Sequence, residues 1–146
     1  RSPRPGWVRS SRTWLAARSA EGEPASINAD FAIELSRALI ARAAGDQAGA
    51  LALADQAAGK LGDRPSPDAT IQAGVMQALT LLDARNSTAA SALMGELEKY
   101  AESDYRVAWV MAALYHALGD ARAAGSARTH ATALAGQRDI GIEPIL

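Results

Sequence analysis

The chain has 146 residues, which is enough for one domain with a buried core, and its formal net charge is −1. This balance argues against a general nucleic-acid-binding protein, because such proteins usually carry a basic excess. The absence of cysteine excludes disulfides, thiol nucleophiles and cysteine-ligated metals.

Residues 1–29 are predicted to form a basic leader that contains one amphipathic helix. The first 20 residues hold five arginines and no acid, whereas the remaining residues hold ten basic and sixteen acidic groups. Trp7, Trp14 and Leu15 fall at helical spacing between residues 7 and 20. The two tryptophans either cover the first part of the fold or anchor a partner. The arginines either form a solvated junction or contact an anionic partner.

After this leader, the sequence predicts a first helical hairpin. Asn28 is expected to cap a helix over residues 29–44, which Gly45 ends. Asp46 is expected to cap the returning helix over residues 47–61. Two antiparallel helices joined by so short a turn form an αα-hairpin.

A second hairpin follows the strongest break in the chain. Ser66-Pro67 combines a capping hydroxyl with a proline at the first helical position, and it predicts a helix over residues 67–84. Either Asn86 or Ser87 caps the partner helix over residues 88–101. No strand is expected, since β-branched residues are sparse and no run alternates between apolar and polar residues.

Ser103-Asp104 is expected to cap the third hairpin, whose first helix is almost entirely apolar and ends at Leu118. Gly119-Asp120 forms the turn, and the last helix runs over residues 121–135. Residues 138–146 form an apolar tail that is expected to be extended and to pack against this hairpin. The predicted hairpin units span residues 30–62, 67–102 and 104–136.

The three units repeat one pattern of small residues. In each unit, a turn is followed by an alanine that opens the second helix, and another alanine stands 12 places upstream. These pairs are Ala38 with Ala50, Ala78 with Ala90, and Ala112 with Ala124. The turn-to-turn spacings are 40 and 34 residues, and the extra six residues lie in the loop over residues 62–67. Small side chains at these positions would let paired helices approach closely.

This helix–turn–helix period resembles that of the tetratricopeptide repeat (TPR) family. The third unit is the most similar, with Ala112, Tyr115, Gly119-Asp120, Ala124 and Ala131 in place. It departs from the family pattern at Trp109, which is one place late, at Arg128 and at Gly136. The resemblance implies an all-α, right-handed solenoid of αα-hairpins with about seven helices. Another αα-hairpin array and a plain helical bundle are the alternatives.

The sequence holds no recognisable catalytic or metal-binding pattern. A G-x-S-x-G nucleophile elbow is absent, and Gly59-Lys60 lacks the flanking residues of a phosphate loop. His116 and His130, the two histidines of the chain, belong to different predicted helices with no third ligand implied. We therefore predict no enzyme activity, no cofactor and no metal.

The family resemblance implies a scaffold that binds a peptide or partner protein in a concave groove lined by the first helix of each unit. The groove residues that this register predicts are Leu35, Leu39, Arg42, Val75, Leu79, Leu82, Arg106, Trp109 and His116. The three basic members would suit a peptide that bears an acidic group. The alternative is that the apolar members simply fill the core.

Two other interpretations fit the sequence. The chain could be a helical regulatory or sensory C-terminal domain of a larger bacterial kinase or transcription regulator, or a bundle that self-associates as a homodimer through the Trp7/Trp14 helix. The richness in alanine and arginine indicates a bacterial source. No uncharged run reaches the ~18 residues that a membrane span requires. A cytoplasmic location is predicted, with the periplasm left open.

Overall fold

The computed structural model describes residues 23–136, with side chains described from residue 29 onward. The predicted helix over residues 7–20 and the tail over residues 138–146 lie outside this range. The described chain contains six α-helices and one 3-10 turn and no strand, so the all-α prediction is confirmed. The elements are α2 (Glu23–Ala43), α3 (Gln47–Gly59), α4 (Pro67–Asp83), α5 (Ser87–Leu97), η1 (Glu98–Tyr100), α6 (Tyr105–Ala117) and α7 (Ala121–Ala135).

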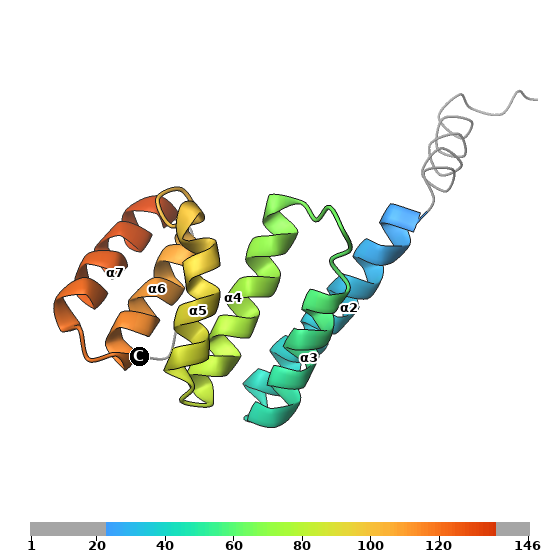
Figure 1. The fold of residues 1–146 in the computed structure, drawn as a ribbon, viewed down its shortest axis with the longest axis horizontal. Helices are drawn as coiled ribbons and strands as arrows, with labels where there is room; N and C mark the ends of the chain where they lie inside the picture. The colour runs from blue at the N-terminus through green and yellow to red at the C-terminus, as the bar shows by residue number, and fades with distance from the viewer. Residues whose placement is uncertain (1–22, 137–146) are drawn as a thin grey trace, which may run out of the picture.

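The helices pack as three successive hairpins that lie in a row (Figure 1). Each hairpin joins consecutive helices: α2 with α3, α4 with α5, and α6 with α7. Helix α4 is central, because it contacts α2 and α3 on one side and α5 and α6 on the other. The first helices of neighbouring hairpins therefore touch one another in the order α2, α4, α6.

The three hairpins share the same turn. Gly45, Arg85 and Gly119 have φ values of 78°, 60° and 79°, in the left-handed region. In each turn, the amide of this residue donates to the carbonyl three residues back, and the following amide donates to the carbonyl five residues back. This is the Schellman arrangement, which satisfies carbonyls at the end of a helix.

The residue after each left-handed position caps the next helix. The side chains of Asp46, Asn86 and Asp120 accept hydrogen bonds from the amide three residues further on, at 3.0, 3.1 and 3.0 Å. One short segment therefore ends one helix and begins the next. The predicted caps at Asp46 and Asn86 are confirmed, and Ser66 and Asp104 likewise cap α4 and α6.

The predicted start of the first described helix was wrong. Asn28 was expected to cap a helix beginning at residue 29, but α2 begins at Glu23. Pro24 lies in the first turn, where the missing amide hydrogen costs nothing, so it begins this helix instead of breaking the chain. Helix α5 also ends early, at Leu97, and continues as the 3-10 turn η1 up to Tyr100.

The core is unevenly distributed along the row. The largest buried cluster joins α4, α5 and α6. It consists of Ile71, Val75, Ala78, Leu79, Ala90, Met94, Leu97, Val107, Val110 and Leu114. Two smaller clusters join α2 and α3 to α4, and they rely on Phe31, Met76 and four alanines. Apolar burial is therefore greatest between the second and third hairpins.

The six alanines of the repeated pattern are all buried, with exposed fractions between 0% and 6%. The sequence analysis did not single out Gly74, which has a related role in α4. A Cβ atom at Gly74 would lie 2.5 Å from the Leu97 side chain, so the glycine allows α5 to approach the backbone of α4. Both helices of every hairpin therefore contain a buried small residue, and a close approach of two helices at a small residue is seen in the second hairpin.

Candidate functional site

The predicted groove residues belong to α2, α4 and α6, and we call the surface that these three helices share the first-helix face. On α4, Asp68, Gln72, Leu79 and Asp83 lie on one stripe of the helix. The two aspartates mark the ends of this stripe, in the first and last turns of α4. Each holds an arginine of a neighbouring first helix.

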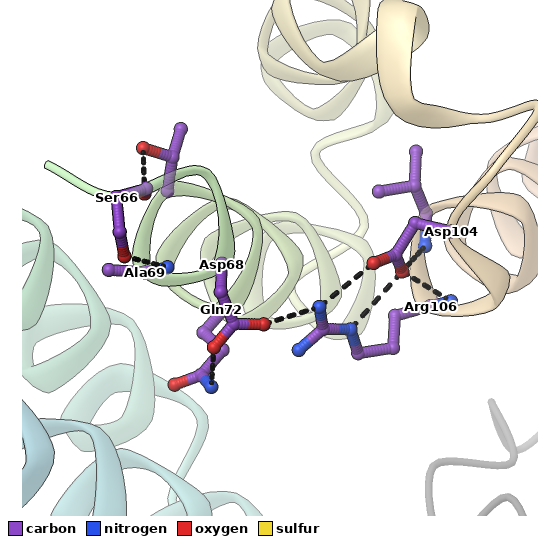
Figure 2. A network of polar contacts seen from close by, with 8 residues as sticks. Ser66, Asp68, Ala69, Gln72, Asp104 and Arg106 are labelled. Atoms are coloured by element: carbon purple, nitrogen blue, oxygen red, sulfur yellow. Dashed lines mark hydrogen bonds and ion pairs between the residues drawn. The ribbon is translucent and has the colours of Figure 1, made fainter.

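At one end of the face, Arg106 connects α6 to α4 (Figure 2). Its Nη2 atom donates to Asp68 Oδ1 at 2.8 Å and to Asp104 Oδ2 at 2.8 Å, and its Nε atom donates to Asp104 Oδ1 at 3.1 Å. The second oxygen of Asp68 accepts from Gln72 Nε2 at 2.8 Å. Ser66 caps α4 beside this network by accepting from the amide of Ala69. The guanidinium is thus shared between two carboxylates.

Asp104 has two roles at this end. Its Oδ1 atom caps α6 by accepting from the backbone amides of Arg106 and Val107, at 2.9 and 3.4 Å. Burial raises the pKa of Asp104, but the hydrogen bonds and positive charge of Arg106 and the two backbone amides outweigh burial, so the net pKa lies below 3.8. The hydrogen bond to Asp104 is the main factor that raises the pKa of Arg106, against the effect of burial.

At the other end of the face, Arg42 in the last turn of α2 binds Asp83 in the last turn of α4. Arg42 Nε donates to Asp83 Oδ2 at 2.7 Å, and Nη2 donates to Asp83 Oδ1 at 3.3 Å. This two-pronged geometry orients both side chains more strictly than a single contact would. Helix α4 is therefore tied by ion pairs to α2 at one end and to α6 at the other.

Between the ion pairs, the predicted groove floor is closed. Val75 and Leu79 are each only 3% exposed and belong to the main core, which corrects their assignment to an accessible groove. They are covered because α6 packs directly against α4. Leu35, Leu82 and Trp109 are half-buried, whereas Leu39 is 47% exposed and His116 is exposed. The indole Nε1 of Trp109 is buried and has no hydrogen-bond partner among the described residues.

The two arginines of the predicted groove are therefore engaged by carboxylates of the fold. The sequence analysis missed these partners, Asp68 and Asp83. Their distance from the arginines along the sequence is the signal that could have identified them. Arg106 follows Asp68 by 38 positions, and Asp83 follows Arg42 by 41. Opposite charges about one repeat apart, on equivalent helices, are placed to meet when successive hairpins pack together.

The remaining chemistry of the described residues is sparse. They contain no group of three or more His, Cys, Asp or Glu side chains arranged to hold a metal ion. None of the helices from α2 to α7 combines the length and apolar character needed to cross a membrane. Comparisons with protein-family models, with curated proteins and with solved structures find no match to this chain.

Proposed function

We propose that this chain is a protein-binding scaffold of the TPR type, which uses the first-helix face to bind a peptide or partner protein. One observation carries the proposal: three hairpins with the same turn place α2, α4 and α6 in contact in sequence order. Such an array creates an extended surface assembled from equivalent helices, which is how repeat proteins recognise their partners.

The side chains of this face favour an apolar contact. Leu39 is the most exposed large apolar residue of the predicted set, and half-buried Leu82 and Trp109 add apolar surface. An acidic group of a partner would compete with Asp83 for Arg42, and with Asp68 and Asp104 for Arg106. We therefore propose that the arginines fix the spacing of the helices, and that the partner binds through apolar side chains.

Site-specific photo-crosslinking tests this proposal. A photoreactive amino acid at position 39 should capture a partner in cells of the source organism, whereas the same group at Thr129, on the exposed side of α7, should not. The captured protein is then purified and its affinity for the unmodified chain is measured. Leu39→Asp should weaken binding by about tenfold or more, which corresponds to about 1.4 kcal/mol.

The matched control is Ala133→Asp, which adds the same charge at an exposed position of α7. It should leave the affinity unchanged. Equal capture from positions 39 and 129, or equal affinity of the Leu39→Asp variant and the unmodified chain, would contradict the use of the first-helix face.

A further inference from the structure

The first hairpin is held to α4 unevenly along the length of the helices. The two clusters that join α2 and α3 to α4 contain Phe31 and Ala73 at one end, and Ala38 and Met76 near the middle. Among the described residues, no member of these clusters lies beyond Ala38 on α2 or beyond Met76 on α4. Apolar contact therefore stops short of one end of the row, which we call the turn end. The turn end is formed by the hairpin turns at Gly45, Arg85 and Gly119 (Figure 1).

The junction between the second and third hairpins is closed at the same end. Leu79 on α4 and Leu114 on α6 belong to the main core there and are 3% and 4% exposed. Leu39 on α2 is the counterpart of Leu79, 40 residues earlier, but it is 47% exposed. Thr80 on α4 is the counterpart of Leu114, 34 residues earlier, and its buried hydroxyl donates to the carbonyl of Gln77 in its own helix at 2.8 Å. At the first junction, an exposed leucine and a threonine therefore stand where the second junction has two buried leucines.

The ion pair of Arg42 and Asp83 holds the turn end of the first junction instead. Its hydrogen bonds of 2.7 and 3.3 Å join the last turn of α2 to the last turn of α4. Both side chains are part-exposed, so salt ions and competing carboxylates can reach them. We propose that this pair is a latch. When it opens, the first hairpin pivots away from α4 at the turn end, about the cluster of Phe31 and Ala73.

The latch lies next to the most exposed apolar residue of the predicted groove. Leu39 is one turn before Arg42 on α2, so opening the latch would enlarge the first-helix face beside Leu39. A partner carboxylate that binds Arg42 would displace Asp83 and so couple binding to the opening. This use of the latch rests on the proposed function, whereas the pivot itself does not.

Distances between spin labels test the pivot without any partner, and the chain has no cysteine of its own to interfere. Cysteines for labelling replace Ala48 on α3 and Thr88 on α5, which are exposed, equivalent positions at the turn end. Asp83→Ala should shift the distances between these labels to longer values and broaden their distribution. Raising the salt concentration about tenfold should do the same in the chain that keeps Asp83, because salt weakens part-exposed ion pairs.

Two further label pairs are the controls. Positions Thr88 and Arg122 span the second junction at the turn end, and positions Gln56 and Glu96 span the first junction at the opposite end. All four side chains are exposed, and each pair again joins equivalent positions of neighbouring second helices. Neither of these distance distributions should shift in Asp83→Ala.

Exchanging the two charges checks that the ion pair itself is responsible. Arg42→Asp/Asp83→Arg should return the distances between positions 48 and 88 to those of the original chain, whereas Arg42→Asp alone should not. Unchanged distances between positions 48 and 88 in Asp83→Ala would overturn the latch. An equal shift between positions 56 and 96 would mean that the whole first hairpin detaches from α4, which would overturn the pivot.

Discussion

The hairpin turns depend on single residues in the left-handed backbone region. Gly45 and Gly119 adopt this conformation without steric cost. In the second hairpin the equivalent residue is Arg85, whose Cβ atom makes the same backbone conformation unfavourable. The hydrogen bonds of the three turns are nevertheless equivalent. The second turn therefore keeps its geometry because the surrounding helices impose it, with Arg85 under local strain.

Arg85→Gly should stabilise the fold. Left-handed backbone costs a non-glycine residue about 1–2 kcal/mol, and the added chain entropy of glycine in the unfolded state offsets about 0.5–1 kcal/mol of that. A net gain of about 0.5–1 kcal/mol in the free energy of unfolding is expected from urea denaturation. Arg85→Ala is the matched control, since it removes the same side chain but keeps the Cβ atom, and it should give no such gain.

Asp104 should make stability sensitive to acid. Because its pKa is lower in the folded state, the unfolded state binds more protons near pH 3.8, and stability rises with pH there. The contribution of Asp104 is present above this pH and is lost as the pH falls through its folded-state pKa. Asp104→Asn should therefore flatten the loss of stability between about pH 5 and pH 3.

The control for this acid effect is Asp120→Asn. Asp120 caps α7 in the same way but is not part of the Arg106 network, and Asn preserves a capping side chain in both variants. Urea denaturation across the pH range compares the two. The quantity compared is the slope of the unfolding free energy against pH in the acid range. If Asp104→Asn changes this slope less than Asp120→Asn does, the ion pair with Arg106 does not cause the acid sensitivity.

Within each hairpin, helix packing depends on small residues. Ala112 on α6 is 0% exposed, and its counterparts Ala38 and Ala78 are equally buried in the other two first helices. Gly74 extends the same principle to α4, because Leu97 occupies the space where its side chain would be. These positions set how closely the helices approach, so their volume matters more than their polarity.

Ala112→Leu should overpack the third hairpin and cost about 1–3 kcal/mol of unfolding free energy. The measurement is thermal or urea denaturation. Ala117→Leu, on the exposed side of the same helix, adds the same atoms where there is space and should change stability by less than about 0.5 kcal/mol. An unchanged midpoint for Ala112→Leu would show that this alanine does not limit the approach of α6 and α7.

Across the whole molecule, stability is expected to follow the uneven core. The junction of α2 and α3 with α4 depends on Phe31, Met76 and small alanines, whereas the junction of α4 and α5 with α6 contains most of the large buried side chains. In a linear array, each unit is stabilised mainly by its immediate neighbours. The first hairpin should therefore open before the other two.

Phe31→Ala should expose this difference. Removing a buried Phe side chain costs about 3 kcal/mol or more, and here the loss falls on the first hairpin alone. Hydrogen exchange with mass spectrometry should show faster exchange in α2 and α3, with α6 and α7 unchanged. Uniformly faster exchange along the chain would mean instead that the three hairpins unfold as one cooperative unit.

The helices and turns were largely predictable from sequence because their causes are local. Gly45 and Gly119 supply left-handed backbone, Asp46 and Ser66 cap helices within three residues, and apolar spacing marks each buried face. The start of α2 was wrong because a proline can either break a helix or begin one. That choice depends on the rest of the helix, not on the proline itself.

The sequence by itself determined the helical character, the three turns and the burial of the six alanines, since each follows from short-range geometry. Only the tertiary structure decided that Val75 and Leu79 are closed off and that Arg42 and Arg106 hold Asp83 and Asp68. These facts depend on which helices lie side by side, and the partners are 38 and 41 residues apart in the chain. Because neighbouring hairpins pack together, the centre of the predicted groove is closed. No local sequence pattern indicates this packing.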